Sequence, residues 1–230
     1  MSSMRAILTD IYKKLYKKYG PRHWWPAESR FEVMVGAILV QNTAWTNVEK
    51  AIHKLSDAGV LSPQGLREIE QDALAQLIYS SGYYNTKARK LKALVDWLGK
   101  RFDDDIEAMM NEDLTVLRQE LLGVHGIGDE TADDILLYAL DMPIFVIDTY
   151  TKRLLFRLSI APETGPYSLY QQTFEQHLPP DVLLFNEYHA LIVTHGANVC
   201  KKEPVCEGCC LLEVCPTGQD RIEASPPLLN

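Results

Sequence analysis

Hydrophobic side chains recur at helical spacing along almost the whole of this 230-residue chain. Residues 4–19, for example, place Leu8, Ile11 and Leu15 on one face, which is the pattern of an amphipathic helix. Only the short run PIFVI (143–147) has the pattern of a strand. The periodicity therefore predicts an all-α protein. We expect its helices at 4–19, 31–41, 44–57, 64–80, 86–101, 112–121, 129–140, 149–158, 166–178 and 181–197.

The most informative break between helices is the glycine-rich turn GVHGIG (123–128). Gly126 and Gly128 allow a tight turn whose backbone N–H groups can approach an anion such as a phosphate. The helix that follows opens with Asp129 and Glu130, which suit the positive end of its dipole. A capped helical hairpin and a phosphate-binding turn are both consistent with this segment.

Asp148, in the segment VIDTYTKRLLFRL, also has two interpretations. It stands between apolar Val146 and Ile147 on one side and an expected helix on the other, so it is a natural N-cap. A carboxylate at the same place can also take part in chemistry. The residues alone leave both interpretations open.

Charge is spread unevenly along the chain, whose formal net charge is −8. Basic residues concentrate in 1–58 and 81–101, whereas residues 102–148 hold thirteen acids and Arg118 as their one basic residue. The negative total argues against indiscriminate binding of nucleic acid, but the asymmetry permits a basic face. No apolar run approaches the ~20 residues that a membrane span requires, and no signal peptide is recognisable. We therefore expect a cytoplasmic protein, associated with the nucleoid if the source is bacterial.

All five cysteines lie within residues 200–215. In a chain expected to be cytoplasmic, such clustering indicates a metal site rather than disulfide bonds. Four cysteine thiolates hold either a [4Fe–4S] cluster or a structural zinc ion.

Three features in this order resemble the endonuclease III-like (helix-hairpin-helix) superfamily of DNA glycosylases. They are the hairpin L-x-G-[VI]-x-G-[VI]-G-x-x-T-A, the segment V-[IV]-D-T about twenty residues later, and the C-terminal cysteines. The resemblance extends from about Trp24 to Cys215. It implies two helical lobes and a monomer that binds double-stranded DNA containing a damaged base. We expect a barrel lobe with the hairpin over 23–143, a second lobe over 1–22 and 144–218, and a loose tail over 219–230.

The resemblance also implies roles for individual residues. Gly126 and Gly128 would present N–H groups to a DNA phosphate, and Gln41 matches a position that fills the gap left by an extruded nucleotide. Bifunctional members carry a lysine at the position of Glu130, and its amine forms a Schiff base with the sugar. Because a carboxylate cannot form an imine, this chain resembles the monofunctional members. Asp148 would stabilise the oxocarbenium-like sugar, and Glu130 would assist water or cap its helix.

A further resemblance concerns the base that is bound. The pattern WWP…QNTAW, together with SGYYNTKA, looks like the 3-methyladenine DNA glycosylases of the same superfamily. In those proteins the residues matching Trp24, Trp25 and Trp45 enclose the base, and Pro26 belongs to the same corner. Aromatic faces attract a cationic alkylated base, although a Trp-Trp-Pro corner packed in a core is the alternative interpretation. Phosphate contacts are expected from Lys87, Arg89 and Lys90.

The superfamily holds its iron–sulfur cluster with C-x6-C-x2-C-x5-C, whereas this chain has C-x5-C-x2-C-x5-C. We expect a [4Fe–4S] cluster, with structural zinc as the alternative. In either case the ligands would be Cys200, Cys206, Cys209 and Cys215, and Cys210 would be surplus.

The resemblance therefore implies a base-excision repair enzyme that hydrolyses the N-glycosidic bond of a damaged base, favoured to be an alkylated, 3-methyladenine-like purine. Two alternatives stay open. One is an endonuclease III-like glycosylase and AP lyase acting on oxidised pyrimidines. The other is a metal-stabilised DNA-binding protein without catalysis, in which Asp148 is only a cap.

Overall fold

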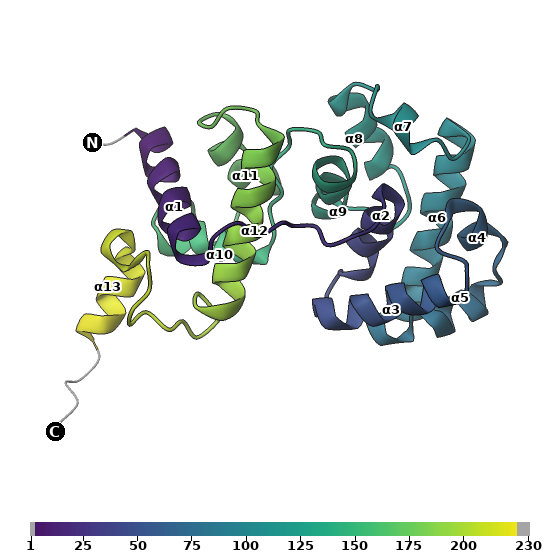
Figure 1. Cartoon of the computed structure of the whole chain (residues 1–230). Helices are drawn as coiled ribbons and strands as arrows, with labels where there is room; N and C mark the ends of the chain where they lie inside the picture. The colour runs from purple at the N-terminus through teal and green to yellow at the C-terminus, as the bar shows by residue number, and fades with distance from the viewer. Residues whose placement is uncertain (1–2, 225–230) are drawn as a thin grey trace. The chain divides into compact units, whose positions relative to one another are not determined.

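The computed structural model describes residues 3–224, and all of their regular secondary structure is helical (Figure 1). The all-α prediction is therefore confirmed. The chain divides into two compact units: unit 1 consists of Met1–Trp24 and Pro143–Asn230, and unit 2 consists of Trp25–Met142. No described helix is long and apolar enough to cross a membrane.

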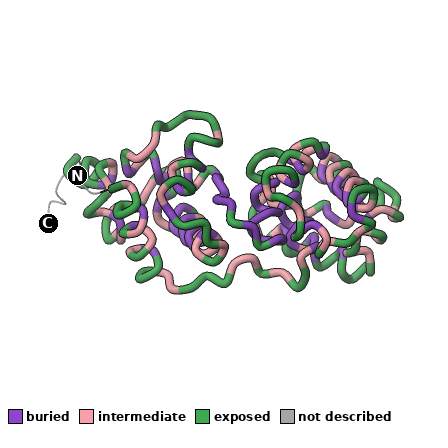
Figure 2. The backbone as a smooth tube through the Cα atoms, turned by 90° about the horizontal axis from the view of Figure 1, so that it is seen from above, coloured by how far each residue is buried: buried purple, intermediate pink, exposed green. Residues whose placement is uncertain are grey.

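Unit 2 is built around α2 (Arg30–Leu39), which is apolar on nearly every face. Its other elements are α3 (Trp45–Asp57), α4 (Pro63–Glu68), α5 (Gln71–Leu77), η1 (Tyr79–Ser81), α6 (Tyr84–Phe102), α7 (Ile106–Met109), α8 (Leu114–Leu122), α9 (Asp129–Asp134) and η2 (Ile135–Ala139). Every residue from Val33 to Leu39 is buried, and α3, α6, α9 and η2 pack against α2. Figure 2 shows the buried stretches of the backbone in purple. A helix that is apolar all round needs such burial, which explains its central position.

The single helix predicted over 64–80 is wrong, because the structure divides this segment into α4, α5 and η1. The backbone is extended at Ile69 and Glu70, between α4 and α5. Lys92 of α6 stabilises the break, since its ammonium donates hydrogen bonds to the carbonyls of Arg67 (2.8 Å) and Ile69. The break between α4 and α5 thus depends on a contact from a helix that is distant in the sequence, and the local periodicity does not indicate it.

Unit 1 combines the N-terminal helix with the C-terminal part of the chain. Its elements are α1 (Met4–Tyr19), α10 (Thr149–Arg157), α11 (Tyr167–Glu175), α12 (Val182–Asn198), η3 (Leu212–Val214) and α13 (Pro216–Glu223). The helix α1 packs on α12, and the buried Tyr188 hydroxyl donates to the carbonyl of Leu8 (2.9 Å). Segments from the two ends of the sequence therefore share one core.

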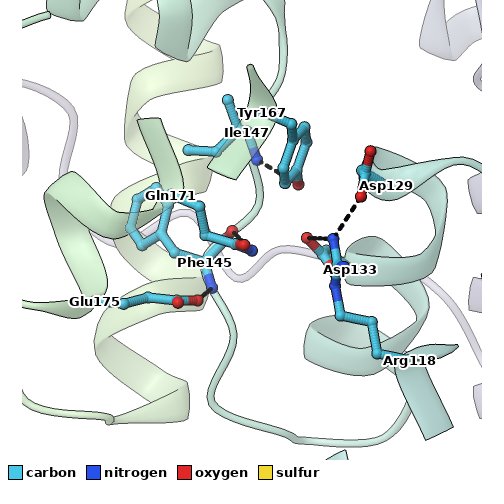
Figure 3. A network of polar contacts seen from close by, with 8 residues as sticks. All are labelled: Arg118, Asp129, Asp133, Phe145, Ile147, Tyr167, Gln171 and Glu175. Atoms are coloured by element: carbon cyan, nitrogen blue, oxygen red, sulfur yellow. Dashed lines mark hydrogen bonds and ion pairs between the residues drawn. The ribbon is translucent and has the colours of Figure 1, made fainter. Parts of the chain in front are cut away.

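The run PIFVI (143–147), predicted as a strand, is an extended segment without a strand partner among the described residues. Side chains satisfy its backbone instead. Glu175 accepts from the N–H of Phe145 (3.0 Å), Gln171 donates to the carbonyl of Phe145 (2.9 Å), and the Tyr167 hydroxyl accepts from the N–H of Ile147 (3.0 Å) (Figure 3). Hydrogen bonds from three side chains of α11 thus replace a sheet ladder.

The loose tail predicted over 219–230 is also corrected in part. Its first residues belong to α13, which runs from Pro216 to Glu223. The remainder of that prediction, residues 225–230, lies outside the described residues.

Candidate active site

The hairpin of unit 2 joins α8 to α9 through the turn at residues 123–128. Gly126 has φ +86°, and a Cβ added there would lie 2.6 Å from Lys90 Cδ, so both the backbone and the space require glycine. Gly128, by contrast, has open space around its Cα. Among the described residues, no acceptor takes the N–H group of Gly126 or Gly128. The turn therefore has free donors for an anion.

Gln41 is hydrogen-bonded to this hairpin. Its Nε2 donates to the carbonyl of Gly126 (3.2 Å) and to the hydroxyl of Thr131 (2.8 Å), while its Oε1 accepts from the ammonium of Lys90. The residue predicted to fill a gap in DNA is thus held against the turn predicted to bind a phosphate.

The acids that follow the turn are largely engaged within unit 2. Arg118 of α8 pairs with Asp129 (2.8 Å) and with the fully buried Asp133 (2.7 Å) of α9 (Figure 3). Burial opposes the charge of Arg118, but the bonds to Asp133 and Asp129 outweigh it and raise the pKa of Arg118. Glu130 is exposed in the first turn of α9. The negative charge beside the turn is therefore partly neutralised by one arginine.

The three predicted basic contacts have different environments. Arg89 is exposed and Lys90 is half-buried beside Gln41. Lys87 is only 2% exposed, and its ammonium is bound to acceptors inside unit 2. The predicted phosphate contact of Lys87 is therefore wrong. The sequence of a basic run does not indicate that one of its lysines is surrounded by hydrogen-bond acceptors from other parts of the fold.

Three aromatic side chains form a cluster in unit 2. The ring of Trp25 lies 5.3 Å from that of Trp45, edge to face, and 5.3 Å from that of Tyr138. We call these three residues the aromatic cluster. Gly36 of α2 lies beneath it, and a Cβ there would come within 3.1 Å of the Trp25 ring. An alanine at this position would therefore require the Trp25 ring to shift by a few tenths of an ångström.

The structure divides the predicted WWP corner. Trp24 belongs to unit 1, while Trp25 and the exposed Pro26 belong to unit 2. The sequence did not single out Tyr138, because this residue lies among the apolar residues of the second hairpin helix. Their pattern indicates only a buried helix face. Tyr138 lies in η2, a π-helical turn, and such turns are frequent at functional sites.

Asp148 of unit 1 caps α10. Its Oδ1 accepts from the N–H of Thr151 (2.7 Å), which is the expected N-cap bond. Its Oδ2 lies 3.9 Å from Nε2 of the buried His189. Only 8% of Asp148 is exposed. One carboxylate oxygen is thus used by the helix and the other has no hydrogen bond among the described residues.

The family follows from similarity to known proteins. Residues 35–180 match the HhH-GPD superfamily base excision DNA repair proteins. The chain belongs to this superfamily. It is 45% identical to "Putative DNA repair glycosylase MJ1434" of Methanocaldococcus jannaschii, over 91% of this chain and 96% of that relative.

Two solved structures share the fold of this HhH-GPD protein. A non-covalent endonuclease III–DNA complex has a TM-score of 0.83 at 22% identity and covers 97% of this chain and 100% of that one. The H. pylori 3-methyladenine DNA glycosylase bound to 1,N6-ethenoadenine has a TM-score of 0.72 at 29% identity. It covers 84% of this chain and 97% of that one. The superfamily recognised in the sequence is therefore confirmed.

Four of the five cysteines of this HhH-GPD protein surround one pocket in unit 1. Cys200, Cys206, Cys209 and Cys215 line it, together with apolar side chains such as Leu154, whereas Cys210 is absent from its lining. Within residues 3–224, no three Cys, His, Asp or Glu side chains are arranged to hold a single metal ion. Four thiols around one largely apolar pocket fit a cluster that is held by four thiolates.

Arg157 fastens the loop around this pocket and was missed by the sequence reasoning. It donates to Cys200 Sγ (3.1 Å), to the carbonyl of Lys201 (2.7 Å) and to the carbonyl of Lys202 (2.9 Å). On the other wall, His195 Nδ1 lies 2.8 Å from the Tyr19 hydroxyl. Helices α10 and α12 therefore contribute to the walls of the cysteine pocket, and α1 supports α12 through Tyr19. The sequence signal that could have identified Arg157 is its position as a basic residue in the last turn of α10.

Acid is expected to destabilise unit 1 through His189. Burial lowers the pKa of His189 from its ordinary 6.5, and the opposing effect of Asp148 is smaller. The unfolded chain therefore binds a proton that the folded chain does not, so the free energy of unfolding falls as the pH drops below 6.5. The expected slope is at most about 1.4 kcal/mol per pH unit.

Urea unfolding at about pH 7.5 and about pH 5 measures this fall, and His189→Gln is expected to reduce it. An equal fall in the variant would assign the acid sensitivity to other groups.

Proposed function

We propose that this HhH-GPD protein is a monofunctional DNA glycosylase that hydrolyses the N-glycosidic bond of an alkylated, 3-methyladenine-like purine in duplex DNA. The observation that carries the proposal is the aromatic cluster of Trp25, Trp45 and Tyr138, in the same unit as the hairpin. The similarity at 29% identity to a 3-methyladenine DNA glycosylase supports the same choice.

The chemistry of the base explains why an aromatic cluster is suited to it. An alkylated adenine carries positive charge, and the electron-rich faces of tryptophan and tyrosine attract cations. A flipped base must also be held by stacking once it has left the duplex. Because a cationic base is a good leaving group, the site needs little general acid catalysis. A sparse set of catalytic residues is therefore sufficient.

Asp148 is the proposed catalytic carboxylate. Breaking the glycosidic bond develops positive charge on the sugar, and a fixed carboxylate stabilises that charge. The N-cap bond from Thr151 and the surrounding burial hold Asp148 in one orientation. The cap uses Oδ1 and leaves Oδ2 for the sugar or for the attacking water. We also propose that Trp24, which lies in the same unit as Asp148, contacts the base.

Glu130 supports the monofunctional part of the proposal. It stands in the first turn of α9, where the bifunctional relatives described above have the lysine that forms a Schiff base. A carboxylate has no amine to attack the sugar. We assign Gly126, Gly128, Arg89 and Lys90 to phosphate contacts and Gln41 to the gap left by the extruded nucleotide.

We further propose that Cys200, Cys206, Cys209 and Cys215 hold a [4Fe–4S] cluster. The cluster supplies a structural tie when it is bound, because it joins the residues on either side of the loop 200–215. The exposed Lys201 and Lys202, whose backbone Arg157 fixes, would then face a DNA backbone. We assign Lys201 and Lys202 to binding and orienting DNA, and they take no part in the reaction.

Base release from a panel of duplexes tests the proposal. Duplexes with 3-methyladenine or another alkylated purine are expected to lose that base, whereas duplexes with oxidised pyrimidines are expected to stay intact. Sodium borohydride is expected to trap no covalent protein–DNA adduct. Release of oxidised pyrimidines together with an adduct would instead identify an endonuclease III-like glycosylase and lyase. Release of no base would support a DNA-binding protein without catalysis.

A further inference from the structure

Lys87 has the most unusual environment of the charged residues in unit 2. It lies in the fourth position of α6 and is 2% exposed. Its ammonium donates to the carbonyl of Leu39 (2.8 Å), to the hydroxyl of Thr43 (2.7 Å) and to the carbonyl of Ser81 (2.6 Å). The three N–H donors of an ammonium therefore meet three acceptors.

The three acceptors come from two separate segments. Leu39 and Thr43 belong to the end of α2 and the loop 40–44, and this loop carries Gln41. Ser81 belongs to η1, at the turn that leads into α6. Thr43 also donates directly to the carbonyl of Ser81, so the two segments are joined twice. Lys87 thus lies at the junction of the Gln41 loop and the turn 79–83.

Both segments present side chains that are suited to DNA. Gln41 stands on the first, and Tyr83 on the second is 73% exposed with φ +46°. Gly82, which precedes it, also has positive φ and lies beside Thr43. Loops with such backbone angles keep one conformation only when surrounding contacts determine it. The ammonium of Lys87 supplies three such contacts at this junction, beside the direct bond from Thr43 to Ser81.

We propose that Lys87 is a positioning residue, whose buried ammonium holds the Gln41 loop and the turn 79–83 in one fixed arrangement for contact with distorted DNA. The inference rests on the proposed binding of DNA from which a nucleotide has been extruded, and it is independent of which base is excised. Lys87 does not touch DNA and acts through the two segments that it joins.

The energetics agree with this role. A buried charge is costly unless hydrogen bonds compensate for it, and burial lowers the pKa of Lys87 to about 8, with Lys90 as the second cause. An apolar residue would avoid that cost, so stability alone gives no reason for an amine here. The three hydrogen bonds give such a reason, because they join two segments that are far apart in the sequence.

Lys87→Met tests the inference with two duplexes, one intact and one containing a tetrahydrofuran abasic analogue. Methionine keeps much of the side-chain length and removes the three donors. We expect the variant to bind the analogue duplex about tenfold more weakly and the intact duplex nearly as well as the wild type does. Fluorescence anisotropy measures both dissociation constants.

Lys92→Met is the matched control. Lys92 lies in the same helix, and its ammonium also donates to two backbone carbonyls, but at the break between α4 and α5. This variant is expected to lose stability and keep its preference for the analogue duplex. An equal loss of preference in both variants would make Lys87 a merely structural residue and overturn the inference.

A double-mutant cycle adds a readout that a structural role would not produce. In a Gln41→Ala background, Lys87→Met is expected to have less than about a threefold further effect on the analogue duplex, because a large part of its effect passes through Gln41. Full additivity would contradict the inference. If Lys87→Met does not fold, Thr43→Val removes one partner at nearly constant shape and is expected to lower the preference about threefold. An unchanged preference in Thr43→Val would overturn the inference.

Measurements on the wild-type protein distinguish a failure of the proposed function from a failure of this inference. A wild-type protein that binds both duplexes equally would contradict the proposed function and this inference with it. A wild type that prefers the analogue duplex, with the same preference in Lys87→Met, would contradict this inference alone.

Discussion

Asp148→Asn is expected to slow base release by at least about a hundredfold. The substitution removes the negative charge that would stabilise the oxocarbenium-like sugar, and it changes little else. Asparagine is as good an N-cap as aspartate, so the bond from the N–H of Thr151 is expected to remain. Single-turnover release of an alkylated base, measured beside the affinity for the same duplex, separates lost chemistry from lost binding.

Asp181→Asn is the matched control for this prediction. Asp181 caps α12 in the same unit, where its Oδ1 accepts from the N–H of Leu184 (3.0 Å). The control is therefore the same chemical change at a cap that the mechanism does not use, and its rate of base release is expected to equal that of the wild type. If Asp148→Asn released the base within about threefold of the wild-type rate, Asp148 would be only a cap.

The helices that could be predicted from the sequence are those determined by local contacts. The helix α1 runs over Met4–Tyr19, as its periodicity predicts, and its N-cap is Ser3. The helix after Asp148 begins at Thr149 because the cap and the apolar residues before it are adjacent in the chain. Where a boundary depends on a distant side chain, as at Ile69 with Lys92, the sequence pattern predicts one helix and the structure has two.

The same distinction applies to the candidate site. The turn at Gly126 was predictable because a backbone with positive φ favours glycine, and a glycine is visible in the sequence. The hydrogen bonds of Gln41 to Thr131 and Lys90 join residues 90 and 49 positions apart, and no local pattern reports them. Lys87 illustrates the cost of this limit, since charge alone suggested a surface residue. Tyr138 was hidden among the apolar side chains of its helix for the same reason.

Cys206→Ser is expected to remove the iron from the protein, and this is the second large effect. Wild-type protein is expected to contain about four iron atoms per chain and to absorb broadly near 400 nm, because four thiolates hold a [4Fe–4S] cluster. Without the cluster, the pocket lined by Cys200, Cys209 and Cys215 loses the link between its thiols and is held only by protein contacts such as the hydrogen bonds of Arg157. The thermal midpoint is then expected to fall by roughly 10 °C.

Cys210→Ser is the matched control, because Cys210 is adjacent to a proposed ligand and is absent from the pocket lining. This variant is expected to keep its iron, its absorption and its thermal midpoint. Loss of iron in Cys210→Ser but not in Cys206→Ser would exchange the two residues in the ligand set. Colourless wild-type protein that contains about one zinc ion per chain would replace the cluster by the structural zinc site. The first interval of the cysteine motif is one residue shorter than in the superfamily. A different metal site would then explain this difference.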